Sequence, residues 1–410
     1  MSQQPKKNPS WVKLRHRIVF AVFYPVVYLL CQLRYGIQVE KHKEKRQWLI
    51  LFNHQTPFDQ FFPCLMFHGP IYFVSTEDII SKGWISRLLD FLVAPIPIKK
   101  QMTDLRAVRN ILQVAREGGS IGIAPEGNRT YSGRTCDINP AIAKLAKKIG
   151  LPVALVRFEG GYGVHPRWSD VRRKADRFPP MEARVAEIIE PEELKELSDE
   201  GLMGRIRRAL YQDDYELVQE TGQQYYSPKS AEYVERALYV CPSCGLTTFQ
   251  SDGNTFLCDG CQGEWEMMPD LSIRPMNEYQ TQGFISMGDW FDYQQDFIRG
   301  LDLHRLPARA LYEDKAALYR VNLYKNKELL AEETVVRLFR DRITVDDDVF
   351  TFSELEAVSV LGRNKLNLYI DKEVYQVVGD ERFNALKYVN FYYRFKNMEK
   401  GVMNEQFLGL

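Results

Sequence analysis

The stretch that decides the fold is "WLILFNHQTPFD", residues 48–59, in which an apolar run passes directly into a polar loop. The run Trp48–Phe52 is short and apolar, and therefore predicts a buried β-strand. His54 follows that strand closely, and Asp59 ends the stretch. Ligands of open α/β sheets bind beyond the carboxyl ends of the strands. The stretch therefore predicts a ligand site at a strand end, with His54 and Asp59 as its first candidates.

A helix start explains part of the same stretch. Thr56 is a suitable N-cap, Pro57 fits the first helical position, and Asp59 then falls where a capping box places an acid. This interpretation leaves His54 unexplained. The two roles are also compatible, because a turn at Thr56–Pro57 would fold Asp59 back onto the imidazole. The spacing alone leaves both helix capping and catalysis open.

Strand-like and helical patterns alternate from residue 48 to about residue 190. The predicted helices include Asp104–Glu117 and one that Asn139 caps and Gly150 ends. Residues 190–235 are helical and charged, and they end this domain. We expect an α/β fold with a mixed, largely parallel sheet and flanking helices. Its predicted strands are 48–52, 71–75, 93–98, 121–124 and 152–158.

An apolar run near the N-terminus, residues 18–33, follows a basic segment and contains Pro25. It is shorter than the roughly 20 apolar residues that span a bilayer, and no signal-peptide cleavage site follows it. We expect a membrane-interface or re-entrant helix, monotopic or peripheral, on the cytoplasmic face of the cell membrane. A buried core helix is the alternative. The basic residues before the run are Lys6, Lys7, Lys13, Arg15 and Arg17.

Two cysteine pairs, "CPSCG" (241–245) and "CDGC" (258–261), are typical of the two knuckles of a zinc ribbon. Four thiolates complete a tetrahedral shell, so the pattern predicts a structural zinc ion and no catalytic metal. A rubredoxin-like iron site and a redox pair are the alternatives. The remaining cysteines imply no disulfide framework and suit a reducing compartment. The predicted metal ligands are Cys241, Cys244, Cys258 and Cys261.

The overall charge argues against a nucleic-acid partner. The chain has 54 basic and 54 acidic residues, so it lacks the basic excess of a nucleic-acid binder. The segment around the cysteine pairs is acidic rather than basic. The zinc ribbon is therefore interpreted as a stabilising spacer or a protein-docking module.

The last hundred residues change to short strands closed by one amphipathic helix. This pattern predicts a small β-rich domain of pleckstrin-homology or GRAM type. We expect four parts: residues 1–40, an N-terminal membrane-associated helical segment; 41–235, the α/β domain; 236–270, the zinc ribbon; and 271–410, a linker with the β-rich domain.

Three further polar blocks belong to the α/β domain. "APEGNRT" (124–130) follows a predicted strand, and the planar guanidinium of Arg129 suits phosphate. A surface turn with an internal Glu126–Arg129 ion pair is the alternative. "PIPIKK" (95–100) ends in two lysines, and a glycine turn, "GGYG" (160–163), follows the last predicted strand. His165, just beyond that turn, is interpreted as a surface-loop residue, with the mouth of the site as the alternative.

The order of these blocks resembles the glycerolipid acyltransferases, and among them most closely the 1-acylglycerol-3-phosphate acyltransferases. The resemblance covers residues 10–190 and rests on His-x-x-x-x-Asp (54–59), a basic residue after an apolar stretch, and Pro-Glu-Gly-x-Arg-Thr (125–130). Asn128 stands where Thr is usual, and Lys100 where Arg is frequent. Lys100 keeps the charge but loses the guanidinium fork.

The resemblance implies a catalytic pair, with His54 as general base and Asp59 as its orienting partner. It also implies an acyl thioester donor, acyl-CoA or acyl carrier protein, a lysophosphatidate acceptor and a phosphatidate product. The apolar N-terminal run would dock on the lipid surface, and an amide near Gly127 or in "GGYG" would bind the oxyanion. The alternatives are another lysophospholipid or glycerol acceptor, or a membrane-tethered lipid-binding scaffold without catalysis. The implied substrate-binding residues are Lys100, Glu126, Gly127, Arg129 and Thr130.

Overall fold

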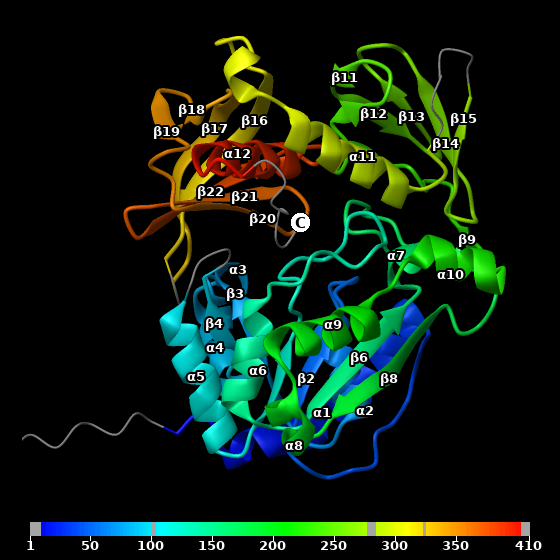
Figure 1. The fold of residues 1–410 in the computed structure, drawn as a ribbon, viewed down its shortest axis with the longest axis vertical. Helices are drawn as coiled ribbons and strands as arrows, with labels where there is room; N and C mark the ends of the chain where they lie inside the picture. Colours follow the sequence, from blue (N-terminus) through cyan, green and yellow to red (C-terminus); the bar gives the residue numbers. More distant parts are fainter. Residues whose placement is uncertain (1–9, 100–103, 277–283, 323–324, 403–410) are drawn as a thin grey trace, which may run out of the picture.

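A computed structural model describes residues 10–99, 104–276, 284–322 and 325–402. The α/β part, blue to green in Figure 1, forms the lower half of the molecule in that view. A four-stranded sheet (residues 249–275) and a second β-rich part lie above it. The described chain therefore confirms an α/β region followed by a β-rich C-terminal region. The boundaries expected at residues 40, 235 and 270 stay predictions.

The α/β part is built on one seven-stranded sheet with the strand order β1-β8-β6-β2-β5-β3-β4. Neighbouring strands are parallel except for the antiparallel pair β6 and β8, so the predicted mixed, largely parallel sheet is confirmed. Strand β2 lies between β5 and β6, and the loops after these three strands meet at one edge of the sheet. The strands are β1 (Ile37–Val39), β2 (Leu49–Phe52), β3 (Ile71–Thr76), β4 (Ile96–Ile98), β5 (Ser120–Ile123), β6 (Val153–Glu159) and β8 (Met181–Ile189).

Alternation along β2 assigns the two faces of the sheet. Ile50 and Phe52 join one hydrophobic core, whereas Leu49 and Leu51 join the other, as the two-residue period of a strand requires. Because both faces are covered, the strand sequence is apolar throughout. The helices of this part are α1 (Leu14–Tyr35), α2 (Phe62–Met66), α3 (Glu77–Ile80), α4 (Trp84–Val93), α5 (Leu105–Arg116), α6 (Ala141–Ile149), α7 (Gly161–Val164), α8 (Pro191–Glu196), α9 (Asp199–Leu210) and α10 (Asp214–Thr221).

Two predicted elements have the right type but different ends. The strand expected at 93–98 begins only at Ile96, because Val93 ends α4 and Ala94 takes a left-handed conformation with φ of 43°. Helix α5 starts as expected, since the Asp104 carboxylate accepts hydrogen bonds from the amides of Arg106 and Ala107.

The N-terminal helix α1 is longer than the apolar run that predicted it. It spans 22 residues, or about 33 Å at 1.5 Å per residue, which matches a hydrocarbon core of about 30 Å. Among the described residues it is the one helix whose length and composition would allow it to cross a membrane. Most of its apolar side chains are exposed, so the alternative of a buried core helix is wrong. The exposed large hydrophobic residues of α1 are Leu14, Ile18, Val22, Phe23, Val26, Tyr28, Leu29, Leu30 and Leu33.

The part that contains the two cysteine pairs has a four-stranded antiparallel sheet and a separate two-stranded hairpin. The strands are β10 (Val240–Cys241), β11 (Gly245–Leu246), β12 (Phe249–Asp252), β13 (Thr255–Cys258), β14 (Glu264–Met267) and β15 (Ile273–Pro275). Helix α11 (Met287–Gly300) follows it, where the sequence suggested only a linker. The short strands β7 (Lys174–Ala175) and β9 (Tyr225–Tyr226) pair with each other.

The last part is a seven-stranded antiparallel sheet with the order β19-β18-β17-β16-β22-β21-β20, and helix α12 packs against it (Figure 1). This arrangement confirms a β-rich C-terminal domain closed by a helix. Its assignment to the pleckstrin-homology or GRAM type stays a prediction. The elements are β16 (Tyr312–Arg320), β17 (Glu328–Leu338), β18 (Arg342–Val345), β19 (Asp348–Thr351), β20 (Ala357–Leu361), β21 (Lys365–Ile370), β22 (Glu373–Gly379) and α12 (Ala385–Glu399).

Candidate active site

His54 and Asp59 form a hydrogen-bonded pair just beyond β2. The distance between His54 Nδ1 and Asp59 Oδ2 is 2.7 Å, and Asp59 is fully buried. The same carboxylate accepts hydrogen bonds from the amides of Gln55 and Thr56 and from the Thr56 hydroxyl. These donors fix the orientation of Asp59, and Asp59 in turn fixes the imidazole ring.

The helix start predicted at Thr56–Pro57 is wrong by several residues. A short 3-10 turn spans Asp59–Phe61, and α2 begins only at Phe62. The Thr56 hydroxyl accepts a hydrogen bond from the amide of Phe58 and donates one to Asp59. This local turn replaces the first helical turn. One half of the expected capping box still forms, because the Asp59 carboxylate reaches back to the Thr56 amide.

The imidazole of His54 is neutral at neutral pH, and within the described part of the chain its Nε2 has no hydrogen-bond partner. Burial lowers the pKa of His54, and the hydrogen bond that His54 donates to Asp59 opposes that effect without overcoming it. A carboxylate only accepts hydrogen bonds, so Nδ1 carries the proton and Nε2 keeps its lone pair. This is the tautomer that a general base requires.

His54 lines a cavity of about 1330 Å³. Pockets for small ligands typically have about 300–1,000 Å³, so this cavity has room for more than a small polar molecule. Most of its walls are apolar, which suits a hydrocarbon chain. Helix α1 contributes Val19, Phe20, Phe23, Tyr24 and Val27, and α4 contributes Leu89, Leu92 and Val93.

The loop 125–130 after β5 is joined to the His54 loop through Glu126. One Glu126 oxygen accepts from the amide of His54 and the other from the amide of Cys136, both at 2.6 Å. Burial raises the pKa of Glu126 to about 8. The amide of Thr130 also donates to the carbonyl of His54, at 2.9 Å. Among the described residues Glu126 forms no ion pair with Arg129, so that alternative is wrong, and the two Glu126 oxygens bind backbone amides instead.

The other predicted substrate-binding residues differ in the contacts that their polar groups already make. Arg129 makes no ion pair or side-chain hydrogen bond with any residue that the structure describes. Burial, together with repulsion from other arginines, lowers its pKa to about 10. The Thr130 hydroxyl already accepts from the amide of Gly133 at 3.0 Å. Gly127 has a φ of 70°, a left-handed conformation that favours glycine. Lys100 lies outside the described residues, and its neighbour Lys99 lines the cavity.

A buried carboxylate that the sequence did not reveal holds the glycine turn. Asp214 accepts from the amides of Gly160 and Gly163 and from the side chain of Gln55, while Gln55 also accepts from the amide of Gly161. The turn is thus tied to the His54 loop. These three glycine amides already have partners, which argues against the turn as the oxyanion site. The only sequence signal for Asp214 is its place beside the N-cap of α10.

His165 is not a surface-loop residue. Its exposed fraction is 7%, and its ring lies 3.1 Å from the hydroxyl of Tyr35 through Nδ1. On its other side, Nε2 lies 3.0 Å from the guanidinium of Arg363. The interpretation from the sequence missed this because both partners are more than a hundred residues away along the chain.

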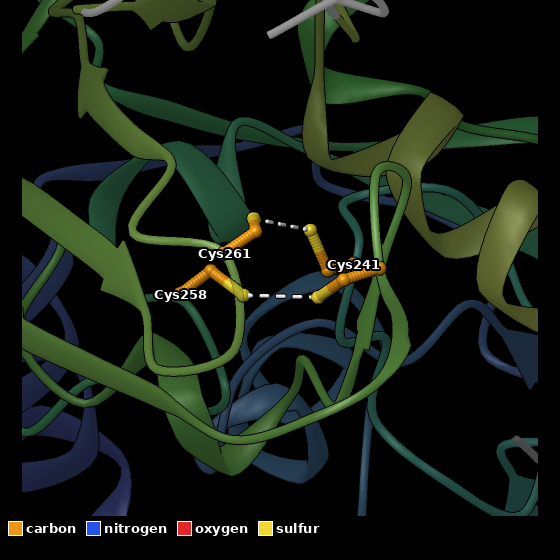
Figure 2. A group of neighbouring side chains, drawn as sticks. Cys241, Cys258 and Cys261 are labelled. Carbon is orange, nitrogen blue, oxygen red and sulfur yellow. Dashed lines mark hydrogen bonds between the residues drawn. The ribbon is translucent and has the colours of Figure 1, made fainter. Parts of the chain in front are cut away.

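The four predicted metal ligands lie together. The ligand atoms of Cys241, Cys244, Cys258 and Cys261 all fall within 4.8 Å of one another. Figure 2 shows Cys258 and Cys261 of one loop facing Cys241 of the other.

The spacing of the sulfurs fits a tetrahedral metal site. Two cross-loop sulfur pairs are separated by 3.5 and 3.6 Å. A zinc ion with Zn–S bonds of about 2.3 Å would hold its sulfurs roughly 3.8 Å apart. The amide of Ser243 and the hydroxyl of Thr247 also lie within hydrogen-bond distance of ligand sulfurs. The cluster therefore could hold a metal ion.

Comparison with known proteins agrees with the site geometry. Residues 36–159 match the family described as Acyltransferase. This range includes the His54–Asp59 pair, loop 125–130 and strands β2, β5 and β6.

A solved structure, the 1-acyl-sn-glycerophosphate acyltransferase PlsC from Thermotoga maritima, shares 19% sequence identity. The match covers 50% of this chain and 81% of that one, with a TM-score of 0.38, a value too low to support any conclusion about this chain. The similarity to known acyltransferases therefore lies in residues 36–159 of the α/β part, which match the Acyltransferase family.

Proposed function

We propose that the chain is a glycerolipid acyltransferase that moves a fatty acyl group from a thioester to the hydroxyl of 1-acyl-glycerol 3-phosphate, giving phosphatidate. The observation that carries this proposal is the neutral His54, oriented by a buried Asp59 at the wall of a large apolar cavity. A base beside space for an acyl chain is what acyl transfer to an alcohol needs. The donor is acyl-CoA or an acyl carrier protein.

In the proposed reaction, Nε2 of His54 takes the proton of the acceptor hydroxyl. The hydroxyl oxygen attacks the thioester carbonyl carbon, the new C–O bond forms and the C–S bond breaks. The imidazolium then returns the proton to the departing thiolate. Asp59 keeps the tautomer and stabilises the imidazolium, and no covalent enzyme intermediate is required.

Binding and positioning fall to different residues in this proposal. Arg129 binds the acceptor phosphate, because its guanidinium has no partner among the described residues. Lys100 adds positive charge, and Gly127 allows close approach of the ligand. Glu126 and Thr130 act as positioning residues that tie loop 125–130 to the His54 loop.

The lipid substrates reach the enzyme from a membrane surface. The exposed apolar side chains of α1 continue onto α4, where Trp84 is 70% exposed and Phe91 is 53% exposed. Both helices also line the cavity. We propose that this apolar face associates with the membrane, with the basic residues that precede the apolar run 18–33 at the headgroups.

We also propose that the four cysteines bind structural zinc. Four thiolates close the coordination shell, so the ion would stabilise the ribbon and take no part in acyl transfer. The cavity that contains His54 is lined by none of these cysteines.

The test is acyl transfer by full-length protein carrying His54→Ala. The assay offers acyl-CoA and acylated carrier protein as donors and a panel of lysophospholipids as acceptors, with products identified by mass spectrometry. Loss of a general base lowers kcat by about 10²- to 10⁴-fold. His68→Ala, which changes an exposed histidine, is the matched control. Wild-type transfer by His54→Ala would refute the mechanism. Transfer to other acceptors only would replace lysophosphatidate.

A further inference from the structure

The C-terminal β-rich domain reaches the candidate active site through the turn between β20 and β21, residues 362–364. The carbonyl of Gly362 accepts a hydrogen bond from Nε of Arg167, at 3.3 Å. Arg363 lies 3.0 Å from Nε2 of His165 and forms an ion pair with Asp170. Helix α12 of the same domain contributes Tyr392 and Tyr393 to the wall of the cavity that contains His54. The domain is thus part of the site's surroundings.

Arg167 connects this turn to loop 125–130. One of its nitrogens donates to the carbonyl of Arg129 at 2.8 Å and lies 3.1 Å from the side-chain oxygen of Asn128. Its guanidinium also stacks over the Tyr131 ring, at 4.2 Å from the ring centroid. Arg167 is 2% exposed. These contacts occupy Arg167, so it serves to hold Arg129 and the β20–β21 turn side by side.

Positive charge exceeds negative charge where these segments meet. Asp170 is shared between Arg363 and Arg236, so a single carboxylate faces two guanidinium groups. His165 adds no charge, because burial and the neighbouring arginines lower its pKa to about 3. Burial and the charges of Arg167 and Arg363 lower the pKa of Arg129, and the negative charge of Asp59 opposes them only in part. An anion between Arg129 and Arg363 would relieve this imbalance.

We propose that Arg363, carried by the β20–β21 turn, binds the phosphate of the acceptor together with Arg129. This inference rests on the proposed function and extends it, because it makes the C-terminal domain a contributor to acceptor binding. Arg363 is 31% exposed, so its side chain has an open side from which a ligand can approach. Two planar guanidinium groups on different segments suit the several oxygens of one phosphate.

The first measurement is steady-state kinetics of full-length Arg363→Gln. We expect the KM for lysophosphatidate to rise by about 10- to 100-fold, the effect of losing a charge-assisted hydrogen bond. The KM for the thioester donor and the kcat at saturating acceptor should stay unchanged. Arg337→Gln is the matched control, since Arg337 is 35% exposed, pairs with Glu313 and lies on β17, away from the turn.

The second variant, Asp170→Asn, separates phosphate binding from simple attachment of the two domains. It breaks the same Arg363–Asp170 ion pair as Arg363→Gln but leaves the guanidinium in place. We expect its KM for lysophosphatidate to stay at or below that of the wild type. If both variants raised the KM equally, Arg363 would be a clip between domains and the inference would be wrong. A rise confined to the donor KM would assign the anion site to the donor instead.

Direct titration with glycerol 3-phosphate makes the test independent of turnover. The wild-type protein should bind this probe about 10- to 100-fold more tightly than Arg363→Gln, in parallel with the KM ratio. If the wild type showed no acyl transfer to lysophosphatidate, the proposed function would fail, and the titration would still report whether Arg363 binds a phosphate. Equal affinity of the two proteins would overturn the inference by itself.

Discussion

The His54 site and the cysteine cluster are each formed by two loops that lie close together. They differ in how many of their polar groups are directed at one another. In the cluster, four sulfurs lie within 4.8 Å of one another and face inward, so one ion would satisfy all of them. At His54, the Asp59 carboxylate and the neighbouring amides are hydrogen-bonded, whereas Nε2 of the imidazole has no hydrogen-bond partner among the described residues, and His54 lines the cavity. Four sulfurs that all bind one ion suit a structural site. A histidine with one ring nitrogen available to a substrate suits a catalytic site.

Removing one of the four cysteine ligands should have the largest effect on stability. In zinc-finger peptides, structural zinc contributes about 10–16 kcal/mol of apparent binding free energy at neutral pH. We expect Cys258→Ser to lose the bound zinc and to lower the melting temperature of the ribbon, as measured by elemental analysis and calorimetry. Cys64→Ser, outside the cluster, should keep the metal. Retention of one zinc per chain by Cys258→Ser would show that the cluster is not the metal site.

Breaking the His54–Asp59 pair should leave the fold intact and remove most of the acyl-transfer activity. Asp59→Asn keeps the shape of the side chain but loses its charge, so the preferred tautomer of His54 and the stabilisation of the imidazolium are both lost. In a comparable triad this change lowers kcat by about 10⁴-fold, and we expect about 10³- to 10⁴-fold here in acyl transfer. Asp348→Asn, an exposed residue of β19, is the control. A loss below tenfold would mean that Asp59 only supports the turn.

A change of Glu126, which holds the His54 loop, should have an intermediate effect on kcat. Glu126→Gln replaces one acceptor oxygen by an amide nitrogen, which would then face the amide of either His54 or Cys136. We expect the displaced loop to lower kcat by about 10- to 100-fold. Near-normal kcat with a raised KM for lysophosphatidate would instead mean that Glu126 contacts the acceptor.

The sequence predicts those parts of the molecule that depend on local pattern. The buried strand Leu49–Phe52 follows from an unbroken apolar run, and α5 follows from its period and its Asp104 cap. The His54–Asp59 pair could also be predicted from the sequence, because both residues belong to one turn. Short-range physics decides all three.

The rest of the site depends on contacts between segments that are far apart along the chain. Gln55 and Asp214 are 159 residues apart, and His165 and Arg363 are 198 residues apart. No periodicity or cap marks such residues, since each takes its role from the side chain that folding brings to it. The helix start predicted at Thr56 was wrong for a local reason instead, because the Asp59 carboxylate accepts hydrogen bonds from the Thr56 hydroxyl and from two amides of the loop.

The smallest predicted effect is on the pH dependence of acyl transfer, which reports the surroundings of His54. Because burial lowers the pKa of His54, the neutral base persists below pH 6.5. We expect kcat/KM to be flat through neutral pH, to fall in acid with a midpoint below 6.5, and then to drop about tenfold per pH unit. Asp59 raises the pKa of His54, so the midpoint in Asp59→Asn should move further into acid. A midpoint above 6.5 would contradict the assignment of the base. A transition near pH 8 that disappears in Glu126→Gln would instead report Glu126, whose pKa burial raises to about 8.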